Sequence, residues 1–201
     1  MNLPNKLTLL RVVLVPVFTI FVLYSQIPFH YFWALLIFIV ASLTDHYDGK
    51  IARDRNLITN FGKFLDPLAD KILIISALIC FLALGFANVW CVLIIIVREL
   101  MVTSLRLLAL EEGGKVIAAN RWGKIKTISQ MAAVIFILFV QSILEIVGKP
   151  SPEPVLLAGS ALIWIATILT VVSGVIYIRE NIAMFRSDKA RHLQNTDFVL
   201  Y

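Results

Sequence analysis

Six long hydrophobic segments alternate with short polar connections along this 201-residue chain. Each has about the 20 mostly apolar residues that an α-helix needs to cross the hydrocarbon core of a bilayer. Short connections favour antiparallel packing of consecutive helices, so the pattern predicts an all-α integral membrane bundle of six transmembrane helices. The predicted spans are Leu9–Gln26, Tyr31–Arg53, Pro67–Phe86, Val89–Leu110, Lys124–Leu144 and Val155–Ile178.

The composition supports a membrane protein and excludes an ordinary soluble domain. Hydrophobic residues make up 60% of the chain and charged residues 15%, against about 45–50% and about 25% in soluble globular domains. The sequence contains no repeat and no low-complexity tract. We therefore expect one membrane domain over residues 1–186, followed by a polar cytoplasmic tail, 187–201, that frays.

Lysine and arginine predict the orientation. If the N-terminus is cytoplasmic, every cation except Arg98 and Lys149 lies at or near a cytoplasmic end of a span, as the positive-inside rule requires. Both termini should then face the cytoplasm. The net charge of +5 is mainly this topology signal and secondarily an attraction to anionic lipid headgroups. No basic stripe lies away from the membrane flanks, so we expect no nucleic-acid partner.

Two cysteines, Cys80 and Cys91, lie in apolar segments. They either form a disulfide or pack as small hydrophobic side chains, the usual role of a buried free cysteine.

Four aspartates interrupt the hydrophobic pattern where the second and third spans meet. Asp45 and Asp48 share one face of the second predicted helix, and Asp66 and Asp70 share one face of the third, because residues three or four apart are neighbours on a helix. At 1.5 Å per residue, Asp45 lies about 21 Å beyond the start of its span. The aspartates are therefore predicted to face a polar cavity open to the cytoplasm.

Ionised aspartate at membrane depth costs roughly 2.5–3.5 kcal/mol per residue, so four of them need countercharge. Two divalent cations would bring the local charge near zero, and all-oxygen ligands favour Mg²⁺ or Mn²⁺. His46 faces another side of the helix and is not expected to be a ligand. The alternative is that the aspartates are solvated membrane flanks, but that does not account for the glycines and arginine that accompany them.

These residues resemble the signature of the CDP-alcohol phosphotransferase family, D-x-x-D-G-x-x-A-R, eight residues, G, three residues, D, three residues, D. Every fixed position is present: Asp45, Asp48, Gly49, Ala52, Arg53, Gly62, Asp66 and Asp70. Looser matches resemble its phosphatidylglycerophosphate synthases. They are Asn2-Leu-Pro-Asn5 with Thr8 and Arg11, Gly62-Lys-Phe-Leu-Asp66-Pro67, Arg98-Glu99 with Leu105-Arg106, and Gly123-Lys-Ile-Lys-Thr127.

The resemblance implies a bacterial inner-membrane enzyme, commonly a homodimer. Such an enzyme transfers the phosphatidyl group of CDP-diacylglycerol to sn-glycerol 3-phosphate and releases CMP. It further implies two metal ions bound by the four aspartates, with Asp70 also the general base. By the same resemblance Gly49, Ala52, Arg53 and Gly62 line the donor pocket, although packing of small residues between helices is an alternative for Gly49 and Ala52.

An acceptor that carries a phosphate dianion needs a cationic pocket. Arg98 and Arg106 are eight residues apart and share a helix face, and Lys124 and Lys126 begin the fifth span on the same side of the membrane. The lysines are two apart, so one is expected to face the pocket and the other to flank it; both could instead snorkel to the interface. Arg98 is near mid-membrane, where a cation is functional or paired, and we expect its partner on another helix.

Asn5, Thr8 and Arg11 recur every three residues on one side of the first helix. They either contact donor phosphates, Asn5 foremost, or lie at the water boundary of an interfacial helix.

Other functions remain open at this stage. The same chemistry could use another acceptor, such as inositol phosphate, serine or phosphatidylglycerol. A small cation transporter could use the aspartates as an ion path, but the inverted repeats or paired broken helices typical of transporters are missing. A non-catalytic scaffold is the third alternative.

Overall fold

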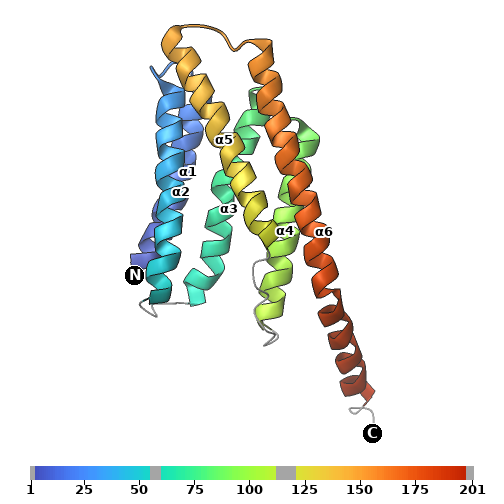
Figure 1. Ribbon diagram of the computed structural model, residues 1–201. Coiled ribbons are helices and arrows are strands. Elements are labelled where there is room, and N and C mark those ends of the chain that lie inside the picture. Colours follow the sequence, from blue (N-terminus) through green and yellow to red (C-terminus); the bar gives the residue numbers. More distant parts are fainter. Residues whose placement is uncertain (1–2, 55–59, 112–120, 198–201) are drawn as a thin grey trace.

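The computed structural model describes residues 3–54, 60–111 and 121–197, and over these ranges the chain is helical with no strand. Side chains are described over 9–44, 71–105 and 121–180. Six helices follow one another along a single elongated bundle (Figure 1). They are α1 Leu3–Leu23, α2 His30–Asp54, α3 Asn60–Ala83, α4 Val89–Glu111, α5 Arg121–Val147 and α6 Glu153–Asp197.

Helix boundaries agree best with the hydropathy pattern at α2 and α4. The ends of α2 and α4 differ from the predicted spans by one residue or none. The last helix differs most, since α6 continues to Asp197 although its apolar part ends near Ile178. The polar segment from 179 to 197 contains neither glycine nor proline, so nothing in it breaks a helix. Loss of hydrophobicity marked the end of the predicted span but not the end of the helix.

The helices pack around a core of aromatic and aliphatic side chains. Phe18 of α1, Phe38 of α2 and Phe81 of α3 are fully buried, and the rings of Phe18 and Phe38 lie 5.9 Å apart. Cys80 and Cys91 are buried and free, which confirms the packing alternative for these residues.

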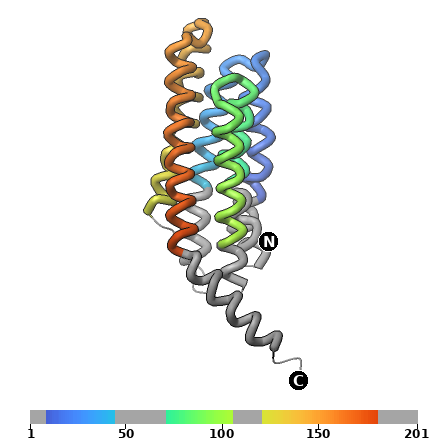
Figure 2. Tube along the Cα trace, turned by 90° about the vertical axis from the view of Figure 1, so that its right-hand side faces the viewer, coloured from blue at the N-terminus to red at the C-terminus, as the bar shows by residue number. Residues whose placement is uncertain are grey.

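Adjacency in sequence does not always mean adjacency in the bundle. Over the described ranges α1 packs against both α2 and α3, α5 packs against α2, α3 and α6, and α4 packs against α3 and α6. The turned view in Figure 2 shows α4 and α6 side by side. The prediction of sequential neighbours therefore holds for α1–α2, α3–α4 and α5–α6, whereas the described parts of α2 and α3 are joined mainly through α1 and α5.

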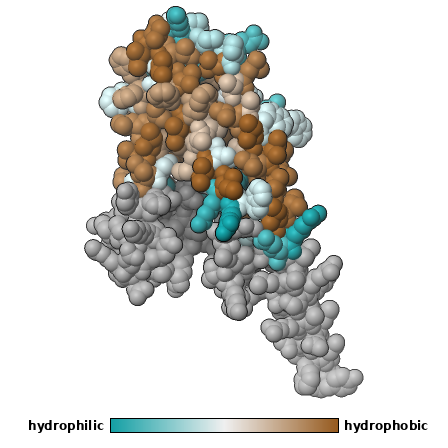
Figure 3. Space-filling view, viewed as in Figure 1, coloured by the Kyte–Doolittle hydropathy of each residue, from teal (hydrophilic) through white to brown (hydrophobic). Residues whose placement is uncertain are grey.

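The outer surface of the bundle is apolar. Large hydrophobic side chains such as Ile128, Leu157 and Trp90 are more than 60% exposed, and brown hydrophobic side chains cover most of the described surface in Figure 3. Exposed apolar area on this scale is unusual for a soluble monomer. Among the described residues, α5 and the stretch Glu153–Glu180 of α6 are long and apolar enough to cross a membrane.

One carboxylate fastens the end of the bundle where α1 connects to α2. Glu145 of α5 accepts hydrogen bonds from the backbone N–H groups of His30 at 3.0 Å and Tyr31 at 3.2 Å. These N–H groups belong to the first turn of α2, which has no intrahelical acceptors for them. The Nδ1 atom of His30 also lies 3.0 Å from the carbonyl oxygen of Phe21. Glu145 therefore caps α2 from another helix.

We expect Glu145→Ala to lower the free energy of unfolding by about 1–3 kcal/mol, because two partly buried N–H groups lose a charged acceptor. Glu153→Ala, which removes an exposed carboxylate from the first turn of α6, is the control, with an expected cost of about 0.3–1 kcal/mol. Thermal unfolding in detergent measures both. Equal losses in the two variants would contradict the capping role.

Candidate functional site

The helices that carry the four aspartates are formed as predicted. α2 includes Asp45 and Asp48 near its end, and α3 includes Asp66 and Asp70 near its start. The end of α2 and the start of α3 lie at the same end of the bundle (Figure 1), which we call the α2–α3 end. The side chains of these aspartates lie outside the described residues, as do those of Asn5, Gly49, Ala52, Arg53, Gly62 and Arg106. Their predicted metal and donor contacts therefore stay predictions.

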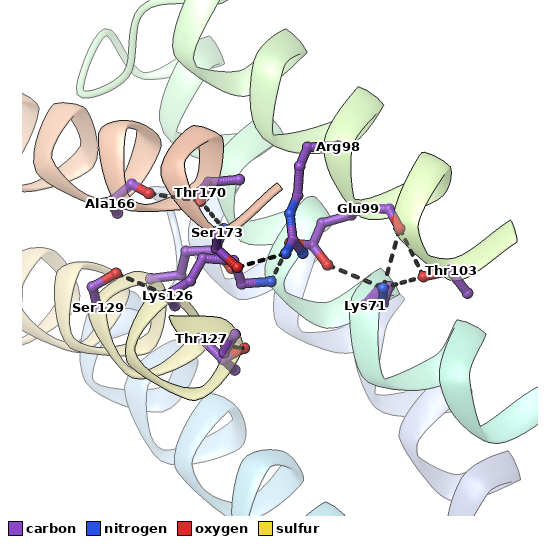
Figure 4. Close-up of polar contacts among 12 residues, drawn as sticks. Lys71, Arg98, Glu99, Thr103, Lys126, Thr127, Ser129, Ala166, Thr170 and Ser173 are labelled. Carbon is purple, nitrogen blue, oxygen red and sulfur yellow. Dashed lines mark hydrogen bonds and ion pairs between the residues drawn. The ribbon is translucent and has the colours of Figure 1, made fainter. Parts of the chain in front are cut away.

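The main polar feature among the described side chains is an ion network centred on Glu99 of α4 (Figure 4). The Oε1 atom of Glu99 pairs with the ammonium group of Lys126 on α5. Its Oε2 atom lies 3.0 Å from the Nζ atom of Lys71 on α3. One carboxylate thus joins α3, α4 and α5.

Lys71 has further partners on α4. Its ammonium group donates to the backbone carbonyl of Glu99 at 3.1 Å and to the hydroxyl oxygen of Thr103. The Thr103 hydroxyl in turn donates to the same Glu99 carbonyl at 2.7 Å. Lys71 is therefore attached to two successive turns of α4.

Arg98 connects this network to α6. One guanidinium nitrogen, Nη2, donates to the hydroxyl of Ser173 at 2.7 Å, and Nη1 lies 3.4 Å from Glu99 Oε1. The expected partner on another helix is thus Ser173. Adjacent helix positions face apart, but the long arginine side chain also reaches its neighbour Glu99.

A glycine on α6 makes room for the arginine stem. A Cβ atom added at Gly174 would lie 3.1 Å from Cγ of Arg98, closer than side chains normally approach. Gly174 therefore lets α4 and α6 come together at the level of the network.

We call Lys71, Arg98, Glu99 and Lys126 the Glu99 cluster. Three cations share one carboxylate, so its formal charge is +2. Glu99 and Lys126 are each 5% exposed and Arg98 is 9% exposed. Buried charges are costly unless they are paired, and an excess of two positive charges attracts an anion.

The structure separates the two lysines that begin α5. Lys126 is buried in the Glu99 cluster, whereas Lys124 is exposed. Positions two apart on a helix point about 200° apart, so the spacing allowed one inward lysine without showing which. Sequence reasoning missed Lys71 and Glu99, although an acidic residue inside a hydrophobic span is itself a functional signal.

An apolar groove borders the cluster between α4 and α6. Its volume is about 350 Å³, and its lining is apolar apart from Arg98. The residues that form it are Trp90, Leu93, Ile94, Val97, Arg98, Met101, Val171, Gly174, Val175 and Ile178. Arg98 therefore contacts the polar network on one side and lines the apolar groove on the other.

Comparison with known proteins matches nearly the whole chain. The CDP-alcohol phosphatidyltransferase family profile matches residues 1–172. The chain is 44% identical over 191 residues to the CDP-diacylglycerol–glycerol-3-phosphate 3-phosphatidyltransferase of Bacillus subtilis, covering 90% of this chain and 95% of that protein. It is 38% identical over 182 residues to the Escherichia coli K12 protein of the same name, covering 88% and 93%. A probable phosphatidylglycerophosphate synthase of Mycobacterium tuberculosis H37Rv is 41% identical over 182 residues, with 88% and 80% covered.

The charge imbalance of the cluster predicts unequal effects of single substitutions on stability. Glu99→Gln removes the described anion from the buried Lys126 and Arg98 and from the partly exposed Lys71, and we expect it to cost about 3–5 kcal/mol, the range for breaking a buried ion pair. Lys126→Met removes one excess charge and leaves Glu99 paired with Lys71 and Arg98, so we expect a much smaller loss or a gain. Thermal unfolding without substrate measures both, and an equal or larger loss in Lys126→Met would contradict this ranking.

Proposed function

The chain belongs to the CDP-alcohol phosphatidyltransferase family, and on this premise we propose that it transfers the phosphatidyl group of CDP-diacylglycerol to sn-glycerol 3-phosphate. The products are phosphatidylglycerophosphate and CMP. The observation that carries the proposal is 38–44% identity, over most of the chain, to relatives named for this reaction. We further propose a homodimer in the bacterial inner membrane, with six spans and both termini in the cytoplasm.

The Glu99 cluster supports an anionic acceptor. Its formal charge of +2 complements a phosphate dianion, and the charges come from side chains held by three helices. Arginine and lysine differ here, because the planar guanidinium group of Arg98 suits two phosphate oxygens while an ammonium group acts as a point charge. We propose that Arg98 and Lys126 bind the acceptor phosphate together with Arg106, which follows Arg98 by eight residues on α4.

The acceptor hydroxyl needs a base near this pocket. Asp70 precedes Lys71 on α3, and Lys71 contacts Glu99 and Thr103. The α3 turn that carries Asp70 is therefore next to the cation cluster. This placement supports Asp70 as the group that takes the proton from the primary hydroxyl of the acceptor.

We propose that Asp45, Asp48, Asp66 and Asp70 bind two divalent cations, because their spacing along α2 and α3 puts each pair on one face of its helix. Mg²⁺ or Mn²⁺ suits such a set. When bound, the ions would stabilise negative charge on the pyrophosphate and on the leaving CMP. We propose that Gly49, Ala52, Arg53, Gly62 and Asn5 bind the rest of CDP-diacylglycerol. Small side chains let the nucleotide lie close to the helix, and Arg53 reaches a phosphate.

CMP release tests the reaction and its acceptor. Purified protein with Mg²⁺ and CDP-diacylglycerol should release CMP rapidly only when glycerol 3-phosphate is added, and excess chelator should stop the release. Asp70→Asn is the control for catalysis and should lose at least about 100-fold in rate, the low end for removing a general base. Faster CMP release with inositol phosphate, serine or phosphatidylglycerol would show that glycerol 3-phosphate is not the preferred acceptor. No CMP release with any acceptor would contradict the proposed enzymatic activity.

The two lysines of α5 offer a matched pair for the acceptor pocket. We expect Lys126→Met to raise the KM for glycerol 3-phosphate at least about tenfold, since each lost charged hydrogen bond costs about 1.5–3 kcal/mol. Lys124→Met makes the same chemical change at an exposed position and should alter this KM less than about twofold, as surface charges contribute little. Steady-state kinetics at saturating CDP-diacylglycerol measures both, and similar values for the two variants would place the pocket elsewhere.

A further inference from the structure

We propose that Glu99 is the positioning residue of the acceptor site, which holds Lys126 and Lys71 in place so that a phosphate meets a preformed set of charges. This inference rests on the proposed function and deepens it. Glu99 does not bind the acceptor phosphate, because carboxylate and phosphate repel each other. It acts through the two lysines.

The geometry of the carboxylate suits this role. Its two oxygens serve different helices, with Oε1 directed to Lys126 of α5 and Oε2 to Lys71 of α3 (Figure 4). A lysine side chain loses rotamer entropy when it is fixed in one position. Contacts that already hold the lysines lower the entropic cost of ordering them when the acceptor binds, which is the advantage of a preorganised site.

The other partners that the structure describes for the lysines and Arg98 are neutral groups. Lys71 also contacts the Thr103 hydroxyl and a backbone carbonyl, and Arg98 contacts the Ser173 hydroxyl. These groups satisfy donors without adding negative charge. Among the described side chains, the Glu99 carboxylate therefore holds both lysines, and the four residues of the Glu99 cluster together keep a positive formal charge that suits a phosphate dianion.

The ion pair between Glu99 and Lys71 connects the proposed phosphate site to the part of α3 that carries the proposed base. Lys71 directly follows Asp70, and Lys71 is tied to α4 through Glu99. Glu99 therefore couples the helix turn that carries the proposed base to the helices that bind the acceptor. Its loss should disturb acceptor binding first and leave the binding of CDP-diacylglycerol largely unchanged.

A purely structural ion pair is the alternative, and Glu145 provides the matched control. Glu145 is also a carboxylate that connects two helices, but it lies at the opposite end of the bundle, against the start of α2. Glu145→Gln should affect stability without changing the KM for either substrate. A role of Glu99 in stability alone would give the same kinetic pattern.

The test compares wild type, Glu99→Gln, Lys126→Met and the double variant by steady-state CMP release. We expect Glu99→Gln to raise the KM for glycerol 3-phosphate at least tenfold and to change the KM for CDP-diacylglycerol less than twofold. In the Lys126→Met background the same substitution should raise the acceptor KM threefold or less, because one of the two lysines it positions is already gone. Such non-additivity is the sign that two residues act as one unit.

Each outcome has a distinct meaning. If the wild-type protein released no CMP in response to glycerol 3-phosphate, the proposed function itself would be wrong. With an active wild type, an unchanged acceptor KM in Glu99→Gln would overturn the positioning role alone. So would a lower KM, the result expected if Glu99 merely opposes the charge of the phosphate.

Glu99→Asp keeps the inference testable where Glu99→Gln does not fold. Aspartate retains the charge but is one methylene shorter, so it cannot reach both lysines as Glu99 does. We expect an acceptor KM at least threefold above wild type, with thermal unfolding close to it. A wild-type acceptor KM in this variant would equally overturn the positioning role.

Discussion

A single carboxylate shared by three cations is the interaction that connects the helices of this bundle at the level of Glu99. Glu99 connects α3, α4 and α5, and its neighbour Arg98 adds α6. Inside an apolar bundle each of these charges would be costly alone. The ion pairs and hydrogen bonds of the Glu99 cluster therefore connect four helices. The four residues of the cluster have a formal charge of +2.

The two ends of the bundle use carboxylates in opposite ways. Glu145 accepts hydrogen bonds from the neutral N–H groups of His30 and Tyr31, so it completes a helix end. Glu99 has three cationic partners, so the Glu99 cluster has an excess of positive charge that attracts an anion. This asymmetry agrees with a reaction at the end where α2 joins α3, since the aspartate pairs are on the helix segments at that end.

Much of the fold could be predicted from the sequence, because hydrophobic length and short connections determine where helices start and end. The exceptions have physical causes: α6 lacks a helix breaker after its apolar part, and over the described residues α1 and α5 each pack against both α2 and α3. The signature also gave the family. The cluster could not be predicted in the same way, because Lys71 and Glu99 are 28 residues apart in the chain and their contact depends on how α3 packs against α4. Hydropathy counted Lys71 as a flanking cation, and spacing alone could not choose between Lys124 and Lys126.

The described hydroxyl partners of the cluster agree with a site that receives negative charge from its substrate. Thr103 and Ser173 satisfy donors of Lys71 and Arg98, at positions where an aspartate or glutamate would have paired the cations more strongly. A second carboxylate would stabilise the resting protein, but it would also compete with any incoming phosphate. A bundle selected for stability alone would gain by neutralising this site. Thr103 and Ser173 supply hydroxyl groups instead of carboxylates, and Glu99 is the carboxylate that the three cations share. Such a set leaves positive charge for the negative groups of a substrate.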